Sequence, residues 1–222
     1  MSLPRIVIVG ASGHGRVALD AARCQGRYEV VGWADTFVAV GTELAGLQVL
    51  GKTAELDRLA AEHRLDGYFL AVSNNPTRAQ VHESLRQLCP RLELVSLIHP
   101  SAVVAGDVSV GPGSLILAGA VVNTGSRLGT ASIVNTRASL DHDGELQDCA
   151  CLLPGVVTGG NVTIGTCACV CLGAHLSHKV RIGEHTVVGA GSVVLADLPA
   201  YSLAYGVPAR VIRRREAHER HF

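Results

Sequence analysis

Aromatic side chains are scarce in this 222-residue chain, because phenylalanine, tyrosine and tryptophan together make up only 4% of it. RNA-binding surfaces stack bases on such rings, and large globular cores are usually rich in them. The formal net charge is zero, with 19 basic and 19 acidic residues, so no basic field for a nucleic acid is present. We therefore expect no nucleic acid among the partners of this protein.

Long apolar runs are absent as well. No stretch approaches the roughly 20 consecutive apolar residues that cross a bilayer, so we expect no membrane insertion. The chain opens on a strand-like segment and not on a signal peptide, which favours a cytoplasmic location.

Seven cysteines are present, and five of them cluster between positions 149 and 171. Their spacing allows a disulfide or a metal site, but we favour reduced cysteines that fill stacked positions of the fold.

A strict six-residue repeat runs from Ile98 to Pro199. Every sixth position from 98 to 194 is aliphatic, with Thr158 as the exception. Four residues after each of these positions stands Ala, Val, Ser, Gly or Thr, until Leu198 ends the run. Neither a helix, with its period of 3.6, nor a strand, with its period of 2, gives this pattern. The repeat predicts a solenoid whose short strands bury their faces by stacking coil on coil.

The first 95 residues have the pattern of a small α/β domain with three or four parallel strands. We predict strands over residues 4–9, 28–33 and 67–72, and helices over 16–24, 53–63 and about 78–88. The glycine loop from Gly10 to Gly15 joins the first strand to the first helix, an arrangement that turns backbone N–H groups toward an anion. Its spacing is GxxGxG, and not the GxGxxG of dinucleotide-binding proteins.

Polar residues follow three predicted strands: the glycine loop, Asp35, and the segment from Ser73 to Arg78. Ligands of open parallel sheets bind at the carboxyl ends of the strands. The sequence therefore predicts a nucleotide site at this edge of the sheet.

These motifs, together with the segment from Ala71 to Asn75 and the hexads, resemble a family of sugar O- and N-acetyltransferases with hexapeptide repeats. The family includes PglD-like N-acetyltransferases of nucleotide-linked 4-amino-6-deoxy sugars and a sialic acid O-acetyltransferase branch of the NeuD type. The resemblance covers essentially the whole chain. It implies a small Rossmann-like α/β domain at 1–95, a left-handed parallel β-helix at 96–199, and a segment at 200–222 that closes the coenzyme A site.

The resemblance also implies an acetyl-CoA-dependent enzyme that acts as a homotrimer, with the acceptor and the coenzyme between neighbouring subunits. The implied acceptor is the amino group of a nucleotide-linked amino sugar, with O-acetylation of sialic acid or a related sugar as the alternative, and no metal is expected. The residues implied for the acceptor are Gly10, Ser12, Gly13, His14, Gly15, Asp35, Asn74, Asn75 and Asn135. Those implied for acetyl-CoA are Cys151, Gly160, Gly189, Ala190, Pro208, Ala209 and Arg210.

Acetylation of an amine needs a base, because an amino sugar is largely protonated near neutral pH. Asp141, His142 and Asp143 place an imidazole beside carboxylates within the hexads. Histidine titrates in the required range, and a carboxylate on its far nitrogen fixes the tautomer. The resemblance implies that His142 is the general base and Asp143 its orienting partner. Direct attack on the thioester would then pass through a tetrahedral intermediate.

The chain departs from the family pattern at three positions. Thr36 stands where a second acidic residue is common, and Ser73 where glycine is common. Cys151, nine residues after His142, stands where many relatives have a second histidine near the thioester. The role of that histidine is therefore lost, reassigned or taken by a thiol. For residues 211–222, the sequence predicts a short basic helix or a frayed tail.

Three other functions account for only part of the sequence. A β-helix zinc carbonic anhydrase would use His142 and His178, which are two coils apart, with His175 near them, but Gly183 occupies the position of that family's third ligand. A non-catalytic nucleotide-binding scaffold would use the solenoid only to trimerise. A nicotinamide oxidoreductase is disfavoured by the glycine spacing.

Overall fold

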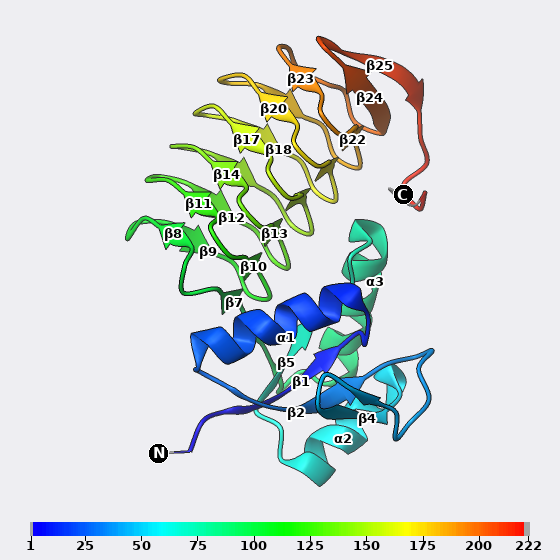
Figure 1. Ribbon diagram of the computed structural model, residues 1–222. Helices are drawn as coiled ribbons and strands as arrows, with labels where there is room; N and C mark the ends of the chain where they lie inside the picture. The colour runs from blue at the N-terminus through cyan, green and yellow to red at the C-terminus, as the bar shows by residue number, and fades with distance from the viewer. Residues whose placement is uncertain (1, 220–222) are drawn as a thin grey trace.

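The computed structural model describes residues 2–219 and consists of an α/β part and a triangular solenoid, which stands above it in Figure 1. The α/β part is built on a six-stranded sheet with the order β3-β4-β2-β1-β5-β6. The strands are β1 (Arg5–Val9), β2 (Glu29–Ala34), β3 (Glu43–Leu44), β4 (Leu47–Gly51), β5 (Gly67–Leu70) and β6 (Glu93–Leu94). The helices are α1 (Gly13–Gln25), the short 3-10 helix η1 (Thr53–Glu55), α2 (Leu56–His63) and α3 (Asn75–Leu88).

The sheet has more strands than the three or four that we predicted. Except for the antiparallel β3–β4 pair, its neighbouring strands run parallel. The β3–β4 hairpin turns at Ala45 and Gly46, which both have positive φ, 50° and 77°. Two such residues suit a tight hairpin turn, but Ala-Gly is a weaker signal than Asn-Gly, so the pattern alone missed this hairpin. Buried residues of α1 pack on one face of the sheet, and those of α2 and α3 on the other.

The solenoid has three flat faces, and each strand pairs in parallel with the strand 18 residues later, as Leu115 does with Ile133. The first face consists of β7 (Leu97–Ile98), β10 (Leu115–Ile116), β13 (Ile133–Val134), β16 (Cys151–Leu152), β19 (Cys169–Val170) and β22 (Val187–Val188). The second face consists of β8 (Val103–Val104), β11 (Val121–Val122), β14 (Ser139–Leu140), β17 (Val157–Thr158), β20 (His175–Leu176) and β23 (Val193–Val194). The third face consists of β9 (Ser109–Val110), β12 (Arg127–Leu128), β15 (Glu145–Leu146), β18 (Thr163–Ile164) and β21 (Arg181–Ile182).

The repeat positions behave as the sequence predicted. The aliphatic residue of each hexad lies in the solenoid core, together with most of the small residues four positions later. This confirms the predicted fold class, an α/β domain followed by a left-handed parallel β-helix.

The C-terminal segment corrects one expectation. It forms an antiparallel hairpin, β24 (Ser202–Gly206) with β25 (Ala209–Arg214), that extends the first face. The prediction of a short basic helix or a frayed tail over residues 211–222 is therefore wrong for residues 211–214, which belong to β25, and residues 220–222 lie outside the described part of the chain.

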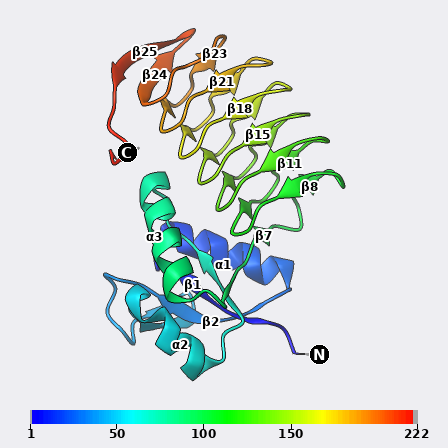
Figure 2. The ribbon, with the colours of Figure 1, turned by 180° about the vertical axis from the view of Figure 1, so that it is seen from behind.

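The first face of the solenoid packs on the α/β part, as both views of the ribbon show (Figure 2). Its outward side chains, among them Leu97, Leu115 and Ile133, join one apolar cluster with Ala18 and Leu19 of α1. Within residues 2–219, no helix is both long and apolar enough to cross a membrane.

Candidate active site

His142 lies at the corner between β14 and β15, where the second face turns into the third. Its Nδ1 atom is 2.8 Å from Oδ2 of Asp143, and the two side chains are 47% and 60% exposed. Asp143 has a φ of 55°, the left-handed conformation with which the solenoid turns several of its corners. The pair therefore points out of the prism, and both side chains are open to solvent.

The main chain and the neighbouring side chains hold this corner in place. Oδ1 of Asp141 accepts hydrogen bonds from Nδ2 of Asn123 at 2.7 Å and from the His142 N–H at 2.8 Å. The Asp141 N–H donates to Oγ1 of Thr158 at 3.0 Å. Thr158 is the one residue that breaks the aliphatic repeat, and this bond gives the exception a physical reason. The polar side chain fixes the backbone directly beside His142.

The electrostatics of the corner favour a protonated imidazole. The hydrogen bond to Asp143 raises the pKa of His142, and the charge of Asp141 acts in the same direction. The hydrogen bond from Asn123 lowers the pKa of Asp141, which therefore stays ionised. His142 can accordingly take up a proton at a higher pH than an ordinary histidine.

The imidazole of His142 lies directly against Gly160 in the next coil. A Cβ atom on Gly160 would overlap Nε2 of the ring, so only glycine leaves room for this position. On the far side, the Gly160 N–H donates to Nδ1 of His178 at 3.0 Å. Residues 142, 160 and 178 thus stack in one column along this corner, a relation that the 18-residue period determines. Sequence reasoning assigned Gly160 to the coenzyme and missed its contact with His142.

The other predicted coenzyme residues lie at the opposite edge of the second face. Gly189 and Ala190 follow β22 at the corner between the first and second faces, and the Gly189 N–H donates to Ala204 O of β24 at 2.8 Å. Pro208 lies in the β24–β25 turn, and Ala209 and Arg210 begin β25. Asn135 lies at the same edge as Gly189, three coils lower. Within one chain, the width of the second face therefore separates Asn135 and Gly189 from His142.

Cys151 is buried between the solenoid and the α/β part. It is 1% exposed, and its Sγ is 3.2 Å from Nδ2 of Asn75 and 3.3 Å from Sγ of Cys169. The side chain points from the first face into the contact with the α/β part. The expectation that Cys151 lines the acetyl-CoA site is therefore wrong within this chain, because the α/β part covers the face that carries it.

The carboxyl ends of β1, β2 and β5 form the predicted crevice of the α/β part. A hollow of about 150 Å³ lies there, and Gly10 and Asp35 are among the residues that line it. A Cβ atom on Gly10, whose φ is 111°, would lie 2.6 Å from Ala71 O, so the loop requires glycine at this point. Asp35 accepts hydrogen bonds from the N–H groups of Ala11, Phe37 and Val38 at 2.7–2.8 Å. Burial raises the pKa of Asp35, but these bonds outweigh it and the pKa is lowered.

The remaining loop residues surround the start of α1 and α3. Ser12 caps α1 by accepting from the Gly15 N–H at 3.3 Å, and Gly13 begins the helix. Asn74 caps α3, since its Oδ1 accepts from the Thr77 N–H at 3.1 Å. Burial, followed by the charge of Arg78, lowers the pKa of His14 to about 4, so this imidazole is neutral.

Asn75 is fully buried and points away from the crevice. Its Nδ2 donates to Ala168 O of the solenoid at 2.9 Å. The neighbouring Arg78, 1% exposed, donates to Ala131 O at 2.9 Å and to Cys149 O at 2.7 Å. The expectation that the Asn75 side chain lines the nucleotide site therefore does not fit its position, because both side chains join the two parts of the molecule.

The crevice includes residues that the sequence did not single out. Phe37, Thr53 and Val81 also line the hollow, together with Thr77 of the predicted polar segment, and Phe37 is 93% exposed. An adjoining hollow of about 340 Å³ shares Thr36, Thr53 and Val81 with it. Thr53 follows β4. Because the sequence did not predict the β3–β4 hairpin, it did not indicate that Thr53 lies at the carboxyl end of a strand.

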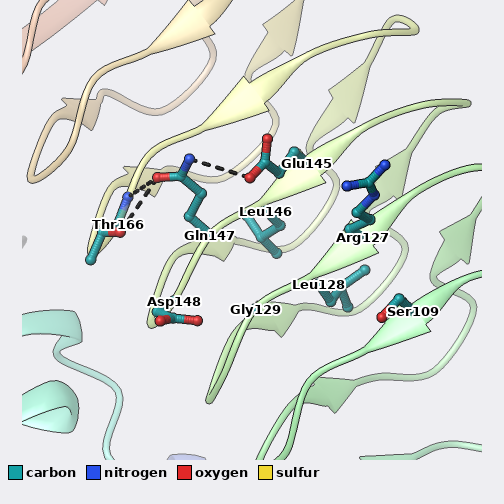
Figure 3. Close-up of a pocket in the computed structure, with 9 residues that line it drawn as sticks. All are labelled: Ser109, Arg127, Leu128, Gly129, Glu145, Leu146, Gln147, Asp148 and Thr166. Carbon is teal, nitrogen blue, oxygen red and sulfur yellow. Dashed lines mark hydrogen bonds between the residues drawn. The ribbon is translucent and has the colours of Figure 1, made fainter.

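A further hollow of about 390 Å³ lies on the third face of the solenoid (Figure 3). Six of its nine lining residues are polar, and Gln147 bridges Glu145 and Thr166 across it. None of the predicted site residues lines it. Among the described residues, the one set of converging metal-binding side chains does not include His142, His175 or His178, so the geometry gives the carbonic anhydrase alternative no support.

Comparison with known proteins adds to this geometry. Residues 5–85 match the model of the PglD N-terminal domain family. The chain is 28% identical over 215 residues to the GDP-perosamine N-acetyltransferase of Escherichia coli O157:H7, covering 93% of this chain and 96% of that one. It is 35% identical to PerB of Caulobacter crescentus, solved in complex with CoA and GDP-perosamine, with a TM-score of 0.87 and coverage of 95% and 98%. It is 33% identical to the acetyltransferase domain of PglB from Neisseria gonorrhoeae FA1090, solved with acetyl coenzyme A, with a TM-score of 0.88 and coverage of 95% and 100%.

Proposed function

Because this chain belongs to the PglD-like family of acetyl-CoA-dependent sugar acetyltransferases with hexapeptide repeats, we propose that it N-acetylates a nucleotide-linked 4-amino-6-deoxy sugar. The observation that carries the proposal is the outward-pointing His142–Asp143 pair, with its 2.8 Å hydrogen bond, at a corner of the solenoid. A non-catalytic scaffold and a carbonic anhydrase do not agree with this family membership.

In the proposed reaction, Nε2 of His142 accepts a proton from the sugar amine. The amine nitrogen attacks the thioester carbonyl, and the carbonyl electrons move to oxygen to form a tetrahedral intermediate. When the intermediate collapses, the C–S bond breaks and the coenzyme leaves as a thiol that takes the proton from His142. Asp143 holds the tautomer in which Nε2 is the base, and Gly160 leaves the ring the space it occupies.

The nucleotide of the acceptor is proposed to bind in the crevice at the carboxyl ends of β1, β2 and β5. The apolar wall near Val81 and the exposed ring of Phe37 offer surfaces for a base. The N-terminal end of α1, with Ser12 and Gly13 in its loop, offers N–H groups for a diphosphate. The homologous E. coli and Caulobacter proteins act on or bind a GDP-linked amino sugar, which supports this class of acceptor.

We propose a homotrimer because the two halves of the site lie at opposite edges of the second face of one chain. His142 lies at one edge of the second face, and Asn135 and Gly189 lie at the other. The outward residues of this face include Val103 and Val157, which are 64% and 42% exposed. An apolar exposed face favours self-association. A second copy against the solenoid would bring the coenzyme edge of one chain to the His142 edge of its neighbour.

The test is a coupled assay of coenzyme A release from acetyl-CoA. The panel contains GDP-, UDP- and dTDP-linked 4-amino-6-deoxy sugars, each paired with its 4-hydroxy counterpart, together with sialic acid. We expect release with at least one amino sugar and none with its hydroxy counterpart. Release with only the hydroxyl acceptors would establish O-acetylation instead. If none of the acceptors in the panel led to release of coenzyme A, the proposal would be refuted.

A further inference from the structure

Three side chains with metal-binding atoms converge where the α/β part meets the first coil of the solenoid. Asp20 and Cys24 are four residues apart on α1, so they project from the same side of the helix. His99 follows β7 directly. One donor atom of each residue lies within 4.8 Å of the other two, and no other such group occurs among residues 2–219.

We propose that Asp20, Cys24 and His99 bind a divalent transition metal ion of the zinc class, at a site separate from the proposed active site. A thiolate, an imidazole and a carboxylate are the ligands that zinc prefers, whereas calcium and magnesium select oxygen donors alone. Three protein ligands leave a fourth tetrahedral position to water.

The geometry is close to that of a metal site without being contracted to it. The three donor atoms lie within 4.8 Å of one another, and tetrahedral zinc places ligand atoms about 3.3–3.8 Å apart, so the donors need to approach by at most about 1.5 Å. Asp20 and Cys24 are exposed, which leaves their side chains free to make this change. His99 is less exposed than the other two residues.

His99 is oriented by a hydrogen bond on one of its ring nitrogens. Nδ1 accepts from the Ser101 N–H at 3.1 Å and lies 2.7 Å from Oγ of Ser101, and this Oγ accepts from the Gly119 N–H in the next coil at 3.2 Å. Metal-binding histidines usually have such a partner on the nitrogen that does not bind the metal, because it fixes both the ring and the tautomer. Because the Ser101 N–H donates to Nδ1, a metal on Nε2 requires the other tautomer, in which the Nδ1 hydrogen is donated to Oγ of Ser101 in exchange for that bond.

Binding would join α1 to the first coil of the solenoid, which lie side by side in both ribbon views (Figures 1 and 2). An ion that binds the folded protein more tightly than the unfolded chain raises the melting temperature. The site is therefore expected to stabilise the contact between the two parts.

The experiment is a titration of the reduced, metal-free, full-length protein with Co²⁺, followed by absorbance and thermal unfolding. Cys24 is the one exposed cysteine of the seven, so a thiolate-to-cobalt charge-transfer band reports on this residue. We expect the band to saturate at one Co²⁺ per chain, to disappear when Zn²⁺ is added, and to accompany a rise in melting temperature.

Single variants decide whether these three residues form the site. Cys24→Ser should abolish the band, and Asp20→Asn and His99→Ala should each weaken Co²⁺ binding at least about tenfold. His218→Ala changes an exposed histidine elsewhere and serves as the control, with binding unchanged. The absence of a thiolate band in the unmodified protein, its persistence in Cys24→Ser, or equal binding by all the variants would each overturn the proposal.

Discussion

At the scale of single residues, the proposed chemistry depends on where the His142 ring lies and which atoms surround it. Gly160 has an ordinary backbone conformation, so its importance comes from space alone. Asp143 and Asp141 act through charge and hydrogen bonds. These two kinds of effect can be separated by substitution.

Replacing Gly160 by alanine should displace the imidazole, because the new Cβ would overlap Nε2 of His142. A displacement of about 1 Å from the reactive position costs up to roughly 100-fold in rate, so we expect kcat to fall by at least about tenfold. Gly106→Ala is the matched control, since a Cβ there meets nothing within 4 Å. Steady-state kinetics of the two variants would show the difference, and equal rates would refute the role given to Gly160.

Replacing Asp143 by asparagine should change the pH dependence of the reaction. The hydrogen bond to Asp143 raises the pKa of His142 above its ordinary value, and the base acts only when unprotonated. Removing the carboxylate lowers this pKa, so the acid limb of kcat/KM against pH should move to lower pH. The plateau should also fall, because the tautomer is less well fixed. An acid limb at an unchanged pH would show that another group titrates.

At the scale of secondary-structure elements, Arg78 of α3 holds the two parts of the molecule together. Its guanidinium donates to backbone carbonyls of both parts, among them Val72 O at 2.8 Å and Cys149 O at 2.7 Å. Arg78→Met would leave several buried carbonyls without a donor, at a cost of roughly 3 kcal/mol or more in the free energy of unfolding. Arg86→Ala on the exposed side of the same helix breaks a surface ion pair with Glu83, and should change stability little. Equal denaturation midpoints for the two variants would contradict this role.

The elements also show how far a sequence can be interpreted by itself. The hexads predicted the solenoid strands well, because a fixed period specifies which residues stack and which point inward. The β3–β4 hairpin escaped prediction because its strands are short and its Ala45-Gly46 turn is an uncommon signal. The same period placed Gly160 over His142, but it does not reveal which face a second domain covers. For that reason the positions of Cys151 and Asn75 became apparent only in the folded molecule.

At the scale of the whole molecule, His142 and Ala190 lie at opposite edges of the second face, and this arrangement predicts a site that two chains share. His142→Asn and Ala190→Trp each damage one edge, and each variant should be inactive alone. If the two chains are co-expressed and assemble at random, about one quarter of the shared sites receive an intact edge from each chain. We therefore expect activity to recover to about that fraction when size-exclusion chromatography with light scattering shows a trimer. No recovery in verified mixed trimers would indicate that each site lies within one chain.

The most direct test of the account is the turnover of His142→Ala with the nucleotide-linked amino sugar that the unmodified enzyme prefers. We expect kcat to fall on the order of 100-fold or more, as for a lost general base, while acetyl-CoA and the sugar still bind and the assembly stays intact. His63→Ala, a histidine at the end of α2, should keep full activity. Turnover close to that of the unmodified enzyme in His142→Ala would contradict the assignment of His142 and, with it, the proposed mechanism.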